Sequence, residues 1–191
     1  ILLGLVGSEM CIRDRNGGEA ASSAAEASKN ANFAITMLPN GKATKEAVLG
    51  ADGIIEKLPK DSLIIDMSTI HPLETDQIRK DLEENGFSMV DAPVGRTSVE
   101  AEKGQSLFMV GAEKQDFKIA QPILACMGDT IIDCGGPGTG SRMKIVNNLM
   151  TTSLNVLTAQ VLTFSDATGL DRDIALKAVS YTHLTLPTIR E

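Results

Sequence analysis

Four polar residues share one face of a long apolar segment: Lys144, Asn147, Asn148 and Thr151, spaced i, i+3, i+4 and i+7. That spacing places them on one side of an α-helix. By spacing alone, a solvated stripe with a surface lysine is the better explanation. Against it, asparagine is a poor helix former and offers amides that hydrogen-bond a ligand. A partly desolvated lysine beside such amides can donate a proton to a carbonyl, so Lys144 is a candidate acid–base residue.

Arg96 is a candidate anion-binding residue. It lies in a loop after an apolar run at Phe87–Val90, with Gly95 before it and Thr97 after it. Loops at strand ends are where open α/β sheets bind ligands, and a guanidinium suits a carboxylate, sulfonate or phosphate. An ordinary exposed loop arginine explains the residue equally well.

Two further strand ends carry candidate cofactor contacts. Met37, Leu38 and Pro39 follow one apolar run, and Thr69 follows the next. In a Rossmann sheet these positions face the crevice that holds a dinucleotide. Ordinary turn chemistry also explains the first of them, because Pro, Asn and Gly in sequence need no ligand to form a turn.

The elements that position these residues alternate between short apolar strands and helices. We predict strands at Phe33–Leu38, Ser62–Met67, Phe87–Val90, Ser106–Gly111 and Thr130–Asp133. Between them we predict helices at Glu19–Lys29, Lys42–Leu49, Pro72 to about Asn85, and Lys114 to about Met127. This alternation predicts an α/β fold with a parallel, doubly wound sheet covered on both faces.

The pattern changes after the glycine-rich run Gly135–Gly140, which lacks the Lys-Ser/Thr of a phosphate loop and is interpreted as an interdomain turn. A long helix is predicted from Ser141 to about Thr168, with Gly169 as its cap and a second helix starting at Asp171. We therefore divide the chain near Pro137. Residues 1–136 would form an incomplete Rossmann-type domain, and residues 137–191 the start of an all-helical domain.

Both ends depart from this pattern. The segment Gly4–Met10 imitates a dinucleotide fingerprint but has Val6 and Glu9 where glycines are required. The tail interrupts a helical pattern with β-branched residues and Pro187. We expect Ile1–Arg15 and Ser180–Glu191 not to be native, and the first βαβ unit, which needs roughly 30 residues, to be missing.

Composition limits the partners. A net charge of −7 argues against nucleic acid or an anionic membrane as the partner. Three cysteines are too few for a disulfide framework or a zinc site, which favours a cytoplasmic protein without a metal. No apolar stretch is long enough to span a membrane.

Five motifs in order resemble the β-hydroxyacid dehydrogenases, the group of 3-hydroxyisobutyrate dehydrogenase and 6-phosphogluconate dehydrogenase. The resemblance covers about Asn16 to Val179 and rests on Ile35–Asn40, Ile65–Thr69, Met89–Val94, Gly135–Gly140 and Lys144–Asn148. It implies a Rossmann domain followed by an all-helical domain that carries a catalytic lysine and mediates homo-oligomerisation.

The resemblance also implies roles for single residues. Leu38 and Thr69 match positions that contact the cofactor, with Met37 and Pro39 beside them. Lys144 matches the catalytic lysine, and Asn148, in the same motif, matches the asparagine that helps position substrate and lysine. The cofactor would be NAD or NADP, with NAD favoured, although the acidic residue that distinguishes the two is not recognisable in the sequence.

One difference between this sequence and the family motif suggests the class of substrate. Most members have Ser-Gly-Gly where this chain has Gly95, Arg96 and Thr97. The loop resembles the subgroup that reduces 3-sulfolactaldehyde to 2,3-dihydroxypropane-1-sulfonate with NADH. There the sulfonate is held by the equivalents of Arg96, Asn147, Asn148 and Thr151.

Other functions remain open. A carboxylate substrate, as in 3-hydroxyisobutyrate or 4-hydroxybutyrate dehydrogenase, would suit Arg96 as well. A non-catalytic binding or assembly module is a further alternative, but it would have no need of Lys144 and Asn148. In the enzyme we expect Lys144 and Asn148 to face a cleft between the domains beside Arg96.

Overall fold

The computed structural model describes residues 17–181, which divide into two compact units with the boundary between Ile145 and Val146. The segment Ile1–Arg15 lies outside the described residues, as does nearly all of Ser180–Glu191. The interpretation of both ends as non-native therefore stays a prediction.

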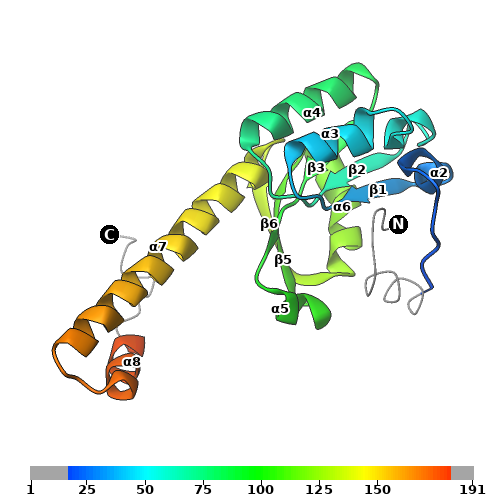
Figure 1. Cartoon of the computed structure of the whole chain (residues 1–191). Helices are drawn as coiled ribbons and strands as arrows, with labels where there is room; N and C mark the ends of the chain where they lie inside the picture. The colour runs from blue at the N-terminus through cyan, green and yellow to red at the C-terminus, as the bar shows by residue number, and fades with distance from the viewer. Residues whose placement is uncertain (1–16, 182–191) are drawn as a thin grey trace. The chain divides into compact units, whose positions relative to one another are not determined.

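The first unit is built on a six-stranded sheet in the order β1-β2-β3-β5-β4, with β6 pairing β5 from Ser106 to Gly111 (Figure 1). The strands are β1 (Phe33–Thr36), β2 (Leu63–Asp66), β3 (Ser88–Asp91), β4 (Val94–Gly95), β5 (Ser106–Gly111) and β6 (Gly128–Gly135). Each of the five predicted strands is present at or near its expected position, and the two-residue β4 is an addition.

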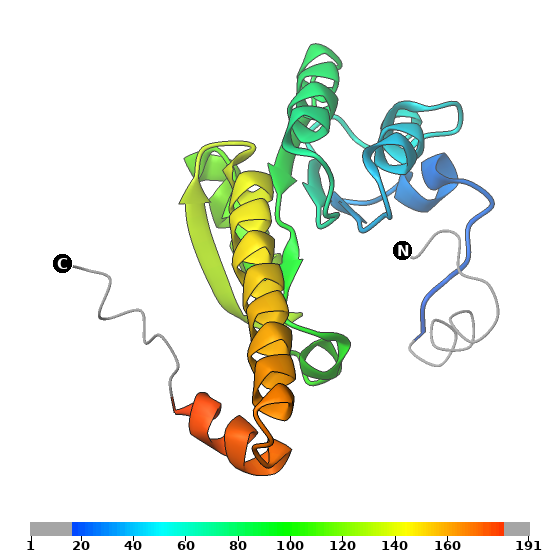
Figure 2. The same ribbon diagram turned by 60° about the vertical axis from the view of Figure 1, so that its left-hand side comes forward.

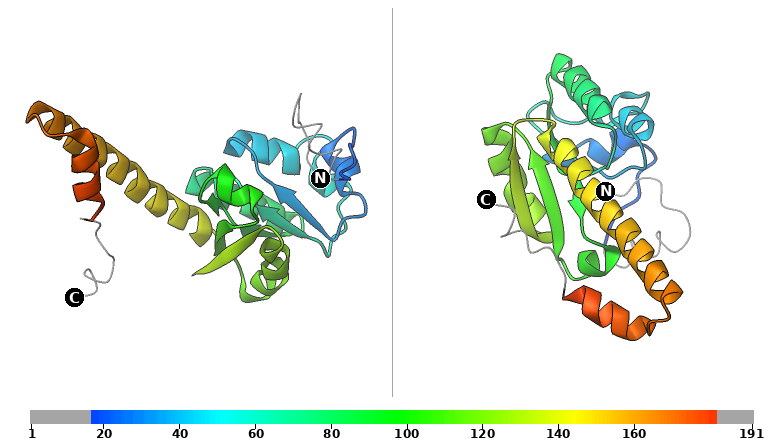
Figure 3. Two further views of the ribbon diagram at one scale, coloured as in Figure 1. Left: turned by 90° about the horizontal axis from the view of Figure 1, so that it is seen from below. Right: turned by 90° about the vertical axis from the view of Figure 1, so that its left-hand side faces the viewer.

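The prediction of a parallel sheet is wrong in one respect. Strands β1, β2 and β3 pair in parallel, and so do β5 and β6, but β5 is antiparallel to both β3 and β4. Figure 3 shows β5 and β6 as neighbouring arrows. The reason lies in the connection over residues 96–105, which is too short for the crossover that a parallel pair requires. The chain instead returns alongside β4, so the sheet is mixed.

Helices cover both faces of the sheet, as expected for a doubly wound fold (Figure 1). On one face lies α6 (Lys114–Ala125). The elements packed against the other face are α2 (Ala24–Ser28), α3 (Gly41–Leu49), the 3₁₀ helix η1 (Ile54–Glu56) and α4 (Pro72–Glu84). A short α5 (Ser98–Glu102), which the sequence pattern did not predict, links β4 to β5.

Side chains alternate along β2 between the two faces of the sheet, so this strand contributes to both hydrophobic cores. Leu63 and Ile65 pack with Leu124 of α6, whereas Ile64 packs with Leu82 of α4. All of these side chains are buried, and each contributes about 1.5–3 kcal/mol of hydrophobic stabilisation. A strand that is buried on both faces explains why the sequence there is continuously apolar.

The second unit contains most of α7 (Thr139–Ala167) and all of α8 (Arg172–Ser180). Gly169 ends α7 with a positive φ of 76°, and the Leu170 amide donates to the Ser165 carbonyl, as a glycine cap requires. Asp171 caps α8 by accepting hydrogen bonds from two backbone amides. Helix α8 is the orange-red helix in Figure 2. The first residues of α7, through Ile145, belong to the first unit.

None of the helices within residues 17–181 is long and apolar enough to cross a membrane. Over the same residues, no cluster of three or more histidine, cysteine or acidic side chains is arranged to hold a metal ion.

Candidate functional site

The carboxyl ends of β1 and β2 bring the predicted cofactor residues together. The Leu38 amide, just beyond β1, donates to Ser68 Oγ, just beyond β2, at 2.8 Å. Met37 is 66% exposed, Pro39 and Thr69 are exposed, and Leu38 is half-buried. The two loops that the sequence assigned to a cofactor are therefore tied to each other at one edge of the sheet.

Beneath these loops lies a buried carboxyl group, Asp66. Its Oδ1 accepts from the Thr36 hydroxyl at 2.8 Å and from the Ser68 amide at 3.1 Å. Its Oδ2 is buried without a hydrogen-bond partner among the described residues. Burial raises the pKa of Asp66, while the hydrogen bonds from Ser68 and Thr36 oppose the rise. The group therefore fixes the strand ends through one oxygen.

This edge fits part of a nicotinamide dinucleotide. It offers the exposed apolar side chain of Met37, the Thr69 hydroxyl, and the start of α3, whose N-cap is Asn40. Apolar surface with a few placed polar groups is the usual lining of a cofactor site, at the carboxyl ends of parallel strands. A glycine-rich turn for the pyrophosphate is not among these residues.

A second constellation lies at the same edge of the sheet, at the carboxyl end of β3, where the root of α7 meets it. We use "α7 root" for residues 138–145. The buried Asp91 accepts hydrogen bonds through both carboxylate oxygens, from the Gly138 amide to Oδ1 and from the Ser141 amide to Oδ2, each at 2.7 Å. Burial raises the pKa of Asp91 to about 6, against the lowering effect of the hydrogen bonds from Ser141 and Gly138.

Two glycines allow the α7 root to approach the backbone of the sheet. A Cβ on Gly140 would collide with the carbonyl oxygens of Met109 and Asp91, and a Cβ on Gly111 would lie 2.6 Å from the Gly140 nitrogen. Any side chain at these positions would push the helix away from β3 and β5. The glycine-rich run thus has a packing role beyond that of a flexible turn.

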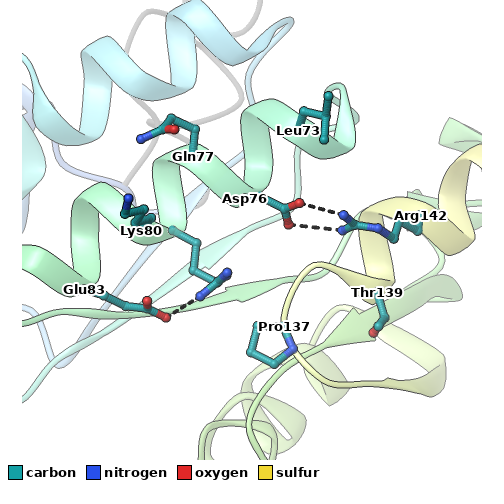
Figure 4. A pocket seen from close by; sticks show the side chains of 9 residues that line it. Leu73, Asp76, Gln77, Lys80, Glu83, Pro137, Thr139 and Arg142 are labelled. Carbon is teal, nitrogen blue, oxygen red and sulfur yellow. Dashed lines mark hydrogen bonds and ion pairs between the residues drawn. The ribbon is translucent and has the colours of Figure 1, made fainter.

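Helix α4 holds the α7 root from a second side. The Thr75 and Ser141 hydroxyls share a buried hydrogen bond of 3.1 Å, and Arg142 forms an ion pair with Asp76 through 2.6 and 3.1 Å contacts. Figure 4 shows this pair on the wall of an open groove of about 840 Å³, which also contains Pro137. The predicted catalytic and cofactor residues do not line this groove, and we interpret it as a junction between the two helices.

Lys144 lies in the α7 root, one turn after Gly140. Residues i and i+4 share a helix face, so Lys144 is on the face that Gly140 presses against the sheet. Its side chain is half-buried, and this burial lowers the pKa of the ammonium group. A lysine whose pKa is lowered gives up its proton more readily, as a general acid must.

The other three residues of the predicted stripe also lie in α7, as expected. Asn148 is half-buried, and Asn147 and Thr151 are exposed. The Thr151 hydroxyl donates to the Asn147 carbonyl at 3.0 Å, a bond within the helix. They belong to the second unit, so their placement around a substrate stays a prediction.

Arg96 has protein partners in this structure. Its guanidinium donates to the Gln105 carbonyl at 2.5 Å, to Asp129 Oδ1 at 2.7 Å and to Thr130 Oγ1 at 3.0 Å. Its backbone has a φ of 68°, in the left-handed region that suits glycine. The three hydrogen bonds offset the cost of that conformation, and they use three of the five N–H donors of the side chain.

The structure therefore ties the two predicted cofactor loops together and fixes the helix turn that carries Lys144. The guanidinium of Arg96 instead donates hydrogen bonds to Gln105, Asp129 and Thr130. The sequence analysis assigned no role to Asp66 and Asp91. The available signal was an aspartate at the end of each of two buried apolar strands, because a carboxyl group is rarely buried without a task.

Comparison with known families decides the identity of the first unit. Residues 8–136 match the model of the NAD binding domain of 6-phosphogluconate dehydrogenase. The chain belongs to this family of NAD-binding domains. The resemblance to β-hydroxyacid dehydrogenases and the Rossmann-like fold are both confirmed.

Curated relatives of the NAD-binding chain are dehydrogenases and reductases by name. It is 45% identical over 166 residues to the 3-sulfolactaldehyde reductase of Escherichia coli K12, an alignment that covers 87% of this chain and 56% of the relative. It is 37% identical over 173 residues to the mitochondrial 3-hydroxyisobutyrate dehydrogenase of mouse, covering 90% and 52%. The chain spans about half the length of the curated relatives it matches.

Solved structures of other proteins share this fold. A 3-hydroxyisobutyrate dehydrogenase of Mycobacterium tuberculosis, solved with L-serine, is 28% identical with a TM-score of 0.80, covering 89% of this chain and 57% of that one. A putative oxidoreductase from Mycobacterium avium 104 has a TM-score of 0.84 at 24% identity, covering 94% and 64%. The second likeness supports the fold alone.

Proposed function

We propose that this chain is part of an NAD(P)-dependent dehydrogenase that transfers a hydride between a nicotinamide cofactor and a small anionic hydroxyacid or aldehyde. The observation that carries the proposal is Lys144, a half-buried amine with a lowered pKa, fixed at the α7 root of an NAD-binding domain. A non-catalytic binding module would gain nothing from a desolvated lysine, because burying it costs free energy.

The roles follow from the chemistry of carbonyl reduction. A bound nicotinamide cofactor supplies the hydride, and Met37, Leu38, Pro39 and Thr69 would hold it. Lys144 would donate a proton to the carbonyl oxygen as negative charge develops there, a contribution of about 10²–10⁴-fold for a positioned general acid. Asn148, one turn further along α7, would orient the lysine and the substrate.

For the substrate, we propose 3-sulfolactaldehyde, reduced to 2,3-dihydroxypropane-1-sulfonate with NADH as the favoured cofactor. The 45% identity to a 3-sulfolactaldehyde reductase and the arginine in the loop after β4 support this choice. Arg96, Asn147, Asn148 and Thr151 would bind the sulfonate. To do so, Arg96 must use its remaining donors or release Asp129, whose pKa is lowered by hydrogen bonds from Thr130 and Arg96.

A carboxylate aldehyde is the second candidate. The 37% identity to a 3-hydroxyisobutyrate dehydrogenase favours it, and 4-hydroxybutyrate chemistry would make the same use of Arg96. We also propose a cytoplasmic homo-oligomer. Large apolar side chains that are exposed on α7 and α8, such as Leu149, Phe164 and Ile174, support association.

The first test compares substrates and Arg96 variants in a full-length protein that contains this sequence. We expect kcat/KM for 3-sulfolactaldehyde to exceed that for a carboxylate semialdehyde. Arg96→Ala should raise KM for the sulfonate by about tenfold or more, because a charge-assisted contact contributes roughly 1.5–3 kcal/mol. Arg96→Lys should rescue it only in part, since one ammonium cannot replace the guanidinium fork.

Two matched variants sharpen this measurement. Asp129→Ala removes a competitor for the guanidinium and should lower KM for the sulfonate, whereas Arg79→Ala, a surface arginine paired with Glu83, should leave it unchanged. Equal KM values for wild type and Arg96→Ala would refute the anion-binding role. A clear preference for the carboxylate would keep the mechanism and overturn the substrate.

A further inference from the structure

The α7 root is fixed by a side chain from a distant strand. The first amides of a helix lack partners within the helix and are usually capped by a neighbouring residue. Here Asp91, 47 and 50 positions earlier in the chain, accepts from Gly138 and Ser141. We propose that Asp91 is a positioning residue, which holds the first turn of α7 and thereby the amine of Lys144. This inference rests on the proposed function of Lys144.

The geometry leaves the helix little freedom at this point. Both oxygens of Asp91 are engaged at 2.7 Å, so they fix a direction as well as a distance. Gly140 lies between these two amides and touches the backbone of β3 and β5. Lys144 follows Ser141 by three residues and Gly140 by four, so it projects from the same turn and face of the helix. A shift of the first turn by 1 Å would move the lysine by a similar amount, which can cost about 10²-fold in rate.

Asp91 can accept both of these hydrogen bonds well only while it is ionised. In a protonated carboxyl group one oxygen becomes a hydroxyl, which donates and accepts much more weakly, and in asparagine an NH2 donor takes its place. One of the two amides would then face a donor and lose its hydrogen bond. Because burial raises the pKa of Asp91 to about 6, the carboxylate is present at neutral pH and is lost in mildly acidic solution.

Other ionisable groups near Asp91 must be separated from it in any pH experiment. They are Arg142 on α7 with its partner Asp76 on α4, Cys134 on β6, and Asp66 on β2, which pairs with Asp91 in the sheet register. Among residues 17–181, Asp91 alone combines a pKa raised to about 6 with hydrogen bonds to the α7 root.

The structural half of the test uses the 191-residue chain and needs no substrate. In Asp91→Asn, amide hydrogen exchange at Gly138 or Ser141 should accelerate about tenfold or more, because one buried donor loses its acceptor. In the wild type, the NMR shifts of the same two amides should titrate with a midpoint near pH 6, which requires no variant to fold. Unchanged exchange, or a midpoint near pH 4, would overturn the anchoring role.

The catalytic half uses a full-length protein that contains this sequence. In the wild type we expect kcat to fall below about pH 6, where Asp91 becomes protonated. Asp91→Asn should lower kcat about tenfold, leave the dissociation constant for NADH within twofold, and abolish this pH dependence. Asp81→Asn, a surface carboxylate paired with Lys45 on α3, should match the wild type in all three measurements.

Comparison with Lys144→Ala separates this inference from the proposed function. If Lys144→Ala is inactive while Asp91→Asn keeps the wild-type kcat and pH profile, the positioning role is refuted and the proposed function stands. If Lys144→Ala keeps the wild-type kcat, the proposed function is refuted, and the catalytic part of this inference with it.

Discussion

Asp66 and Asp91 occupy register-paired positions at the carboxyl ends of β2 and β3, and both are almost fully buried. They differ in what their second oxygen does. Asp66 accepts hydrogen bonds through Oδ1 and leaves Oδ2 without a partner among the described residues, whereas Asp91 uses both oxygens. The first arrangement can be served by any group with one acceptor, and the second requires a carboxylate. At one edge of the sheet, Asp66 therefore holds the ends of β1 and β2 through one oxygen, and Asp91 holds the α7 root through two.

The largest expected effect is on the free energy of unfolding, which the buried charge of Asp91 lowers at neutral pH. Its pKa rises from 3.8 in the unfolded chain to about 6 in the folded one, so protonation favours the folded state. The stabilisation is fully present below about pH 4 and is lost as pH rises through 6, an effect of about 3 kcal/mol. Asp91→Asn should therefore be similar to wild type at pH 4 and more stable at pH 7 by up to about 3 kcal/mol. Urea unfolding at both pH values measures this difference.

A stability gain together with a loss of kcat would show that the carboxylate is retained for position rather than for stability. Equal stability differences at pH 4 and pH 7 would contradict the raised pKa on which the comparison depends.

A second, smaller effect concerns the glycines of the α7 root. Gly140→Ala should destabilise the chain by about 1–3 kcal/mol, because the new methyl group collides with two carbonyl oxygens. Gly136 is the matched control, since a Cβ there meets nothing within 4 Å and its φ is not positive. Thermal unfolding of both variants would test the contact, and equal midpoints would show that the helix can move away without cost.

The smallest effect separates the two aspartates directly. In Asp66→Asn the amide oxygen can replace Oδ1, so hydrogen exchange at the Ser68 amide should change by less than about threefold, as expected when a hydrogen bond is kept. The same substitution at Asp91 should accelerate exchange at Gly138 or Ser141. An equal acceleration at both sites would mean that the two carboxyl groups are equivalent.

Much of the fold could be predicted from the sequence, because buried strands and amphipathic helices leave their period in the pattern of apolar residues. The direction in which two strands pair leaves no such pattern, so the sequence did not predict the antiparallel pairing of β5 with β3. The two-residue β4 is too short to leave a pattern and was also missed. The predicted end of α7 at Gly169 was confirmed, since that signal is local.

The residues of the candidate site likewise divide into those that local sequence signals predict and those whose contacts only the tertiary fold creates. Lys144 and the loops at Leu38 and Thr69 follow from local spacing and motif. Asp91 does not, because its task depends on amides about fifty residues later in the chain that only the tertiary fold brings to it. Arg96 was predicted from its type and loop, but its contacts with Asp129 and Thr130 are also tertiary.

The most direct test of the account is the rate of a full-length protein carrying Lys144→Ala, with 3-sulfolactaldehyde and saturating NADH. We predict that kcat falls by about 10²–10⁴-fold, roughly 3–5 kcal/mol of barrier, because no other group in the α7 root would deliver the proton. The dissociation constant for NADH should stay within about threefold of wild type, since Lys144 is assigned to the reacting carbonyl and the cofactor is assigned to the edge of β1 and β2. A kcat within threefold of wild type would contradict the assignment of Lys144 as the proton donor.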